Sequence, residues 1–172
     1  MLGGRGVCDG ISKATVALLR SNGIDSQIVR GRLLDTDPKE PGHAWVMVRL
    51  GEHCYHLDSK FSVGEGASTH YMCLVDDRTA SKDRTWNMPE HMECNTMSEN
   101  WYYRRHLVAS SRAKLNNMLQ GWDSDRRLEV LLEFDYDPDS VYKTVYNVER
   151  QGALLPSGNL YIFQNVLVIE EE

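Results

Sequence analysis

Residues 43–58, HAWVMVRLGEHCYHLD, contain the pattern of a β-hairpin. β-Branched and aromatic residues are common in both halves, as is typical of strands. Gly51-Glu52 lies between the halves and predicts a two-residue turn with glycine first, which suits type II′. This turn places Leu50 opposite His53 and thereby fixes the register of the whole hairpin.

The predicted register decides which side chains share a face of the sheet. It places His43, Trp45 and Asp58 on one face, with His43 and Asp58 as diagonal neighbours within side-chain reach. A four-residue loop would place these two residues directly opposite each other, whereas a three-residue loop would separate them onto two faces. The opposite face has an apolar pattern typical of a core, formed by Ala44, Val46, Val48, Leu50, Tyr55 and Leu57.

A cysteine directly precedes the first helical pattern of the chain. Residues 8–22, CDGISKATVALLRSN, have apolar residues at helical spacing, and Asn22-Gly23 is a helix stop. Cys8 is therefore expected at a helix N-terminus, where the helix dipole and unpaired N–H groups favour a thiolate. Asp9 opposes this effect, while nearby glycines, Gly6 among them, leave the approach to the sulfur uncrowded.

A cysteine nucleophile needs a base, and the base needs an orienting acceptor. We expect Cys8 to attack an amide or ester carbonyl while His43 accepts the thiol proton and returns it to the leaving group. Asp58 would orient the imidazole and stabilise its charged form. His56 lies on the same face and is the alternative base. Trp45 either packs there or shields the His43–Asp58 hydrogen bond from water.

The remaining patterns indicate an α+β protein with two parts. Residues 1–105 form the predicted catalytic core, and residues 106–172 form a C-terminal extension of a helix followed by a β-α-β segment. The other expected elements are strands at 26–34 and 70–75, a helix at 106–121, a strand at 127–134, a helix at 137–150 and a closing strand at 159–169.

Composition excludes several classes of function. The 172 residues suffice for about one domain, and the formal charge of −6 includes no basic excess for nucleic acid or an anionic membrane. No apolar run reaches the ~18 residues of a membrane span, and no export signal opens the chain. The compartment is therefore unknown from the sequence, and our expectation is a cytoplasmic protein or a domain of a larger exported protein. His53, Cys54 and His56 lack a further ligand pair at zinc spacing, so we expect no metal and no cofactor.

Three segments together resemble the transglutaminase-like superfamily. They are GVCDGISKATVALLRSNGIDSQIVRGR, GHAWVMVRL and CYHLDSKF, within about residues 3–62, and DDRTASKDRTW at 76–86 is similar to a segment of bacterial members. The resemblance implies a papain-like fold, in which a helix bearing the cysteine packs on an antiparallel sheet. It also implies a triad of Cys8, His43 and Asp58.

The resemblance implies cysteine-dependent acyl transfer on peptide amides, as in a peptidase or amidase that forms a thioester. A peptide or protein substrate is expected, bordered by Trp45, Gly6 and Gly42. The superfamily also includes protein-glutamine transamidases and catalytically inactive binding or assembly modules, which remain alternatives. Its members have helices before the cysteine helix. The wall that these helices form is therefore expected to come from a partner chain, a preceding segment or the C-terminal extension, or to have no replacement. Asp58 is followed by Ser-Lys where the family has Pro-Thr.

Overall fold

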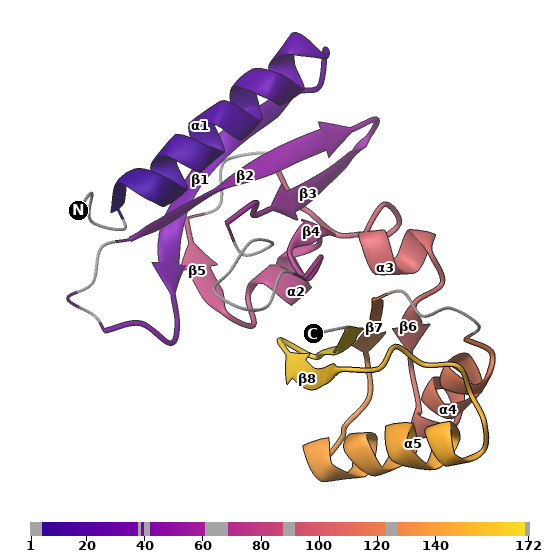
Figure 1. Ribbon diagram of the computed structural model, residues 1–172. Helices are drawn as coiled ribbons and strands as arrows, with labels where there is room; N and C mark the ends of the chain where they lie inside the picture. The colour runs from indigo at the N-terminus through magenta and orange to yellow at the C-terminus, as the bar shows by residue number, and fades with distance from the viewer. Residues whose placement is uncertain are drawn as a thin grey trace. The chain divides into compact units, whose positions relative to one another are not determined.

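The computed structural model describes residues 5–37, 39, 42–60, 69–87, 92–122 and 127–170 (Figure 1). The chain divides into two compact units, Met1–Trp101 and Tyr102–Glu172, and each contains helices and a sheet. The α+β class predicted from the sequence is thereby confirmed. Among the described residues, no helix has both the length and the apolarity that crossing a bilayer requires.

The first unit begins with helix α1, Arg5–Ser21, which is three residues longer at its N-terminus than predicted. Its buried face carries Cys8, Ser12 and Val16 at intervals of four residues, the spacing that keeps side chains on one side of a helix. The helix ends where Gly23 takes φ +75° and Ile24 N–H donates to the Leu19 carbonyl, which is a Schellman cap.

The first unit also contains an antiparallel sheet in the order β4-β3-β2-β1-β5. Leu50 pairs with His53, and Gly51 in the turn between them has φ +61°, so the predicted two-residue hairpin is confirmed. The strands are β1 Ser26–Leu33, β2 His43–Leu50, β3 His53–Leu57, β4 Cys73–Val75 and β5 Arg84–Trp86.

The two faces of this sheet pack against different partners. Val46 and Val48 contact Val16 of α1, so the helix covers the face that the sequence predicted to be apolar. The opposite face carries Trp45 and Met47 in a second cluster, whose further members are Val29, Cys54, Cys94, Trp86 and Met92. The candidate active-site residues of β2 belong to this second face.

A short helix joins β4 to β5. Helix α2, Asp77–Ala80, is capped by Asp76, whose carboxylate accepts from the Thr79 backbone N–H. The helix presents Asp77 toward β3, where its carboxylate reaches His56. Helix α2 and strand β5, of four and three residues, are too short to show a period in the sequence.

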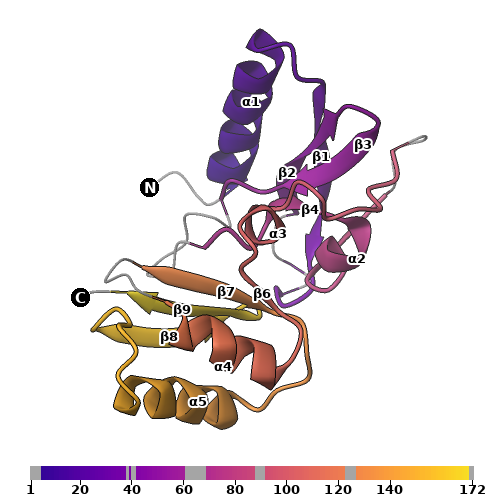
Figure 2. The ribbon, with the colours of Figure 1, turned by 90° about the vertical axis from the view of Figure 1, so that its right-hand side faces the viewer.

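The second unit contains a mixed sheet in the order β6-β7-β9-β8, with β6 parallel to β7. Its core joins residues of the sheet to Leu115 and Leu119 of α4 and to Val145 and Val148 of α5 (Figure 2). The elements are α3 Trp101–Arg104 at the junction of the units, β6 Val108–Ala109, α4 Arg112–Gln120, β7 Leu128–Leu132, α5 Pro138–Arg150, β8 Asn159–Phe163 and β9 Val166–Glu170.

Two predicted elements of this unit differ in the structure. The expected helix 106–121 is shorter, because Ser111 caps α4 after the brief strand β6. The expected closing strand 159–169 is a hairpin, because Gln164 and Asn165 take φ +49° and +63° and reverse the chain. Positive φ at both turn positions suits type I′, but Gln-Asn is a weaker signal for that turn than Asn-Gly.

Candidate active site

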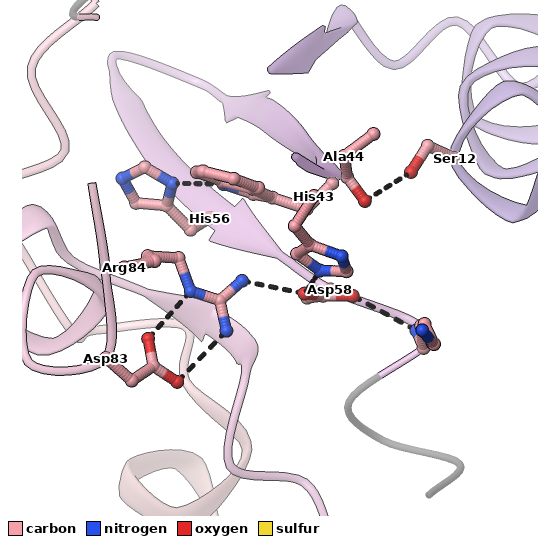
Figure 3. Close-up of polar contacts among 9 residues, drawn as sticks. Ser12, His43, Ala44, His56, Asp58, Asp83 and Arg84 are labelled. Atoms are coloured by element: carbon pink, nitrogen blue, oxygen red, sulfur yellow. Dashed lines mark hydrogen bonds and ion pairs between the residues drawn. The ribbon is translucent and has the colours of Figure 1, made fainter. Parts of the chain in front are cut away.

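His43 and Asp58 meet on the face of the sheet predicted from the hairpin register (Figure 3). His43 is the first residue of β2, and Asp58 directly follows β3. Nε2 of His43 lies 2.5 Å from Oδ2 of Asp58, and both side chains are buried. The prediction that the two side chains are neighbours is therefore confirmed.

The Asp58 carboxylate has two further partners. Nη1 of Arg84 donates to the same Oδ2 at 2.7 Å, and the backbone N–H of Lys60 donates to Oδ1 at 3.1 Å. Burial by itself would raise the pKa of Asp58, but the hydrogen bond and charge interaction with His43, together with Arg84, hold that pKa below its usual value. Asp58 is thus kept ionised as a fixed acceptor.

Arg84, on β5, is a residue of the site that sequence reasoning missed. Its guanidinium is completely buried, pairs with both oxygens of Asp83 at 2.8 and 3.1 Å, and lies 5.1 Å from the centre of the Trp45 ring. Two carboxylates and an aromatic face thus compensate for its desolvation. The adjacent charged residues Asp83-Arg84 were the available sequence signal for an ion pair. A strand of three residues has no periodicity from which the direction of the Arg84 side chain could be predicted.

Trp45 packs behind the histidine. Its ring lies 5.8 Å from that of His43 with an interplanar angle of 20°, and Nε1 donates to Nδ1 of His56 at 2.9 Å. None of the residue is exposed, so the structure gives the indole a packing contact with His43. Contact between Trp45 and a substrate stays a prediction.

Cys8 lies in the first turn of α1 and is 5% exposed. One turn later, Oγ of Ser12 donates to the Ala44 carbonyl at 3.0 Å, which joins this part of the helix to the residue next to His43 (Figure 3). Asp9 is paired with Lys13 and Arg30. Two cationic side chains therefore pair with the Asp9 carboxylate near the start of the helix.

The two glycines predicted at the substrate have different surroundings. Gly6 belongs to the first turn of α1. Gly42 directly precedes β2, and a Cβ there would lie 2.8 Å from the carbonyl oxygen of Gly31. Glycine at position 42 therefore allows β2 to start close to β1. That either glycine borders a substrate stays a prediction.

His56 is the centre of a second polar cluster. Nδ1 accepts the Trp45 indole proton, so Nε2 carries the ring proton and donates to Oδ1 of Asp77 at 2.7 Å. Burial lowers the pKa of His56, although Asp77 opposes this shift. Both ring nitrogens of His56 are thus used in hydrogen bonds away from Asp58.

The same cluster has a composition that metal ions use. Ligand atoms of His56, Asp77 and Cys94 lie within 4.8 Å of one another. A metal ion at Nε2 of His56 would displace the proton that this nitrogen donates to Asp77. Because Nδ1 accepts a hydrogen bond from Trp45, neither ring nitrogen would then carry a proton, and the ring would have to be an imidazolate anion. Metal-ligating histidines instead donate their second ring N–H. The hydrogen bonds therefore account for this cluster better than a metal centre does.

The fold and the site together define an α+β protein in which a buried helix cysteine accompanies a buried His–Asp pair on an antiparallel sheet. The model of the transglutaminase-like superfamily matches residues 1–59, which include Cys8, His43 and Asp58. The resemblance seen in the sequence is confirmed over this segment, and it indicates a family of cysteine-based acyltransferases and proteases. No curated protein matches the chain.

Proposed function

We propose that the protein hydrolyses peptide or protein amides through a thioester on Cys8, within a papain-like arrangement. The observation that carries this proposal is the buried His43–Asp58 hydrogen bond of 2.5 Å. A carboxylate fixed in this way orients the imidazole and stabilises its protonated form. The match of residues 1–59 to the transglutaminase-like superfamily supports the same class of chemistry.

The contacts of His43 support a role for one of its two ring nitrogens in this proposal. The ionised Asp58 can only accept, so Nε2 carries a proton and donates to Oδ2. The basic lone pair of the neutral ring is then on Nδ1. In the proposed mechanism, Nδ1 accepts the proton of the Cys8 thiol, and the imidazolium that forms is stabilised through Nε2 by Asp58.

The reaction then has two steps. The Cys8 sulfur attacks the carbonyl carbon, and the tetrahedral intermediate expels an amine that takes the proton from His43, leaving a thioester. Water attacks the thioester with His43 as base, which releases a carboxylic acid and restores the thiol. Backbone N–H groups at the start of α1 would stabilise the oxyanion in both steps.

A library of glutamine-containing peptides tests this proposal. The protein is incubated with the library with and without a primary amine, and products are identified by mass spectrometry. Hydrolysis in both conditions supports the proposal. Amine incorporation in place of hydrolysis would make the protein a transamidase, and tight peptide binding without any product would identify a binding module.

Variants assign the nucleophile in the same assay. Cys8→Ala should abolish product formation, because alanine has no sulfur with which to form the thioester. The matched control is Cys73→Ala, since Cys73 is a half-buried thiol on β4 of the same unit. Unchanged turnover in Cys8→Ala would remove the nucleophile assignment.

A further inference from the structure

Two cysteines outside the proposed triad lie in direct contact. Cys54 is on β3 and Cys94 is in the segment after β5, 40 positions further along the chain. Their Sγ atoms are 2.8 Å apart, and the two residues are only 3% and 1% exposed. A disulfide bond is about 2.05 Å long, so the sulfurs need to approach by roughly 0.8 Å to form one.

We propose that Cys54 and Cys94 are a redox pair that closes reversibly into a disulfide by exchange with a low-molecular-weight disulfide such as oxidised glutathione. The inference goes beyond the proposed acyl transfer and does not depend on it. It rests on the contact between the two sulfurs and on the way both cysteines are held.

The backbone around Cys94 is held in place by Asp77. The Asp77 N–H donates to the Cys94 carbonyl at 2.7 Å, and the Cys94 N–H donates to Oδ2 of Asp77 at 2.9 Å. Cys54 is held from the other side, within the β3 ladder opposite Arg49. Both sulfurs therefore meet on a rigid support, which reduces the conformational entropy that closing a disulfide would otherwise cost.

The contact also makes the two thiols chemically unequal. The thiol of Cys94 donates to the sulfur of Cys54, which lowers the pKa of Cys54 and raises the pKa of Cys94. Cys54 is thus the better attacking thiolate. Cys94 lines a surface hollow of about 480 Å³, whose other lining residues are Asp76, Asp77, Arg78, Glu93 and Asn95. The hollow therefore opens at Cys94, whose sulfur touches that of Cys54.

The exchange balances without any other reactant. The Cys54 thiolate attacks one sulfur of oxidised glutathione, forms a mixed disulfide and releases one glutathione thiolate. The Cys94 thiol then loses its proton and attacks the Cys54 sulfur, which expels the second glutathione. The protein loses two hydrogens in total, and one molecule of oxidised glutathione becomes two of reduced glutathione.

The disulfide would stabilise the contacts that support His43 in the candidate active site. Asp77 binds His56, His56 accepts from Trp45, and Trp45 stacks on His43. A bond from Cys94 to Cys54 on β3 would therefore fix the position of Asp77, the first residue in this series of contacts. In the reduced protein the same series of contacts depends on hydrogen bonds and packing alone.

The pair is tested by peptide mapping across a series of glutathione redox buffers that contain a chelator. Remaining thiols are blocked with iodoacetamide in denaturant, and the digest is analysed without reduction. A cross-linked Cys54–Cys94 peptide should appear as the buffer becomes more oxidising and disappear with dithiothreitol. If both cysteines are alkylated at every ratio, or if the cross-link joins another pair, the inference is wrong.

A chelator is included because a metal ion bound by Cys94 would also block alkylation. Protection that vanishes with the chelator alone, before any reductant is added, would contradict the disulfide. The mapping is repeated in Cys8→Ser, where no mixed disulfide can form at the proposed nucleophile. This variant should give the same cross-link whether or not the proposed acyl transfer is correct.

Thermal unfolding gives a second readout. The oxidised protein should melt at a temperature higher by on the order of 10 °C, since the disulfide closes a loop of about 40 residues. Cys94→Ser should lose this dependence on oxidation, and Cys73→Ser should retain it. If Cys94→Ser does not fold, the map and melting temperatures of the native chain still decide, and equal melting temperatures would contradict the inference.

Discussion

Nε2 of His43 and Nη1 of Arg84 approach the same carboxylate oxygen, Oδ2 of Asp58, at 2.5 and 2.7 Å. One buried acceptor therefore connects the proposed base to a permanently charged guanidinium. Through this shared oxygen, Arg84 helps to set the position and ionisation of the carboxylate that holds His43. We regard Arg84 as a positioning residue.

Asp58→Asn should impair the reaction while leaving the shape of the site nearly unchanged. The amide cannot stabilise an imidazolium as a carboxylate does, and we expect kcat/KM to fall by about 10³–10⁴-fold, as for other triad aspartates. Steady-state kinetics on a peptide found in the library assay measure this loss. Asp25→Asn is the control, since the Asp25 carboxylate forms an exposed pair with Arg49 at 3.7 Å. Equal losses in the two variants would contradict the role of Asp58.

Arg84→Met should destabilise the first unit at neutral pH. The variant leaves Asp58 and Asp83 buried with one cationic partner fewer, and removing one member of a buried ion pair costs about 3–5 kcal/mol. Urea unfolding at pH 7 measures the change in the free energy of unfolding. The control is Arg49→Met on the exposed pair, which should cost less than about 1 kcal/mol.

The effect of Arg84→Met should shrink in acid. The pKa of Asp58 is lowered in the folded protein, so the stability it contributes is present above the unfolded pKa of about 3.9 and is lost as the pH falls through the folded pKa. Without Arg84 the folded pKa rises and this contribution disappears. The difference between native protein and variant should therefore be largest at neutral pH and shrink as the pH falls below about 4. A difference that stays constant in this acid range would contradict the ion-pair explanation.

His56 should make stability depend on pH in a different window. Burial lowers its pKa, so the folded protein binds fewer protons than the unfolded chain. The stability that His56 contributes is therefore complete above its unfolded pKa of about 6.5 and declines as the pH falls below that value, by at most about 1.4 kcal/mol per pH unit. His56→Gln should flatten the free energy of unfolding between about pH 6.5 and 5. Exposed His53→Gln should not, and equal slopes in both variants would overturn the assignment.

Gly31→Ala should destabilise the sheet where it supports Trp45. A Cβ at Gly31 would lie 2.0 Å from the Thr85 carbonyl oxygen and 2.7 Å from Cη2 of Trp45, so either β5 or the indole must move. We expect a loss of about 3 kcal/mol in the free energy of unfolding. Gly10→Ala is the control: its Cβ meets no atom within 4 Å, and alanine should stabilise helix α1 by about 0.5–1 kcal/mol. Similar effects in the two variants would contradict the steric explanation.

The hairpin could be predicted because its signals are local. Alternation along β2 and β3 and the glycine-first turn fixed the pairing of Leu50 with His53, and that register alone brought His43 and Asp58 to one face. The end of α1 could be predicted for the same reason, since Gly23 supplies the left-handed conformation that the cap requires. The hairpin at Gln164-Asn165 was missed because its turn residues give a weaker signal for the same conformation.

The sequence by itself determined the α+β class, the cysteine-bearing helix, the hairpin and the His–Asp pair, because each follows from a short-range period or a turn. Only the tertiary structure decided that Arg84 joins Asp58, that Trp45 and Asp77 occupy both nitrogens of His56, and that Cys54 touches Cys94. These contacts join strands and loops that are distant along the chain and too short to carry a pattern. These contacts depend on how buried charges and sulfurs pack in the folded protein, so no local spacing in the sequence predicts them.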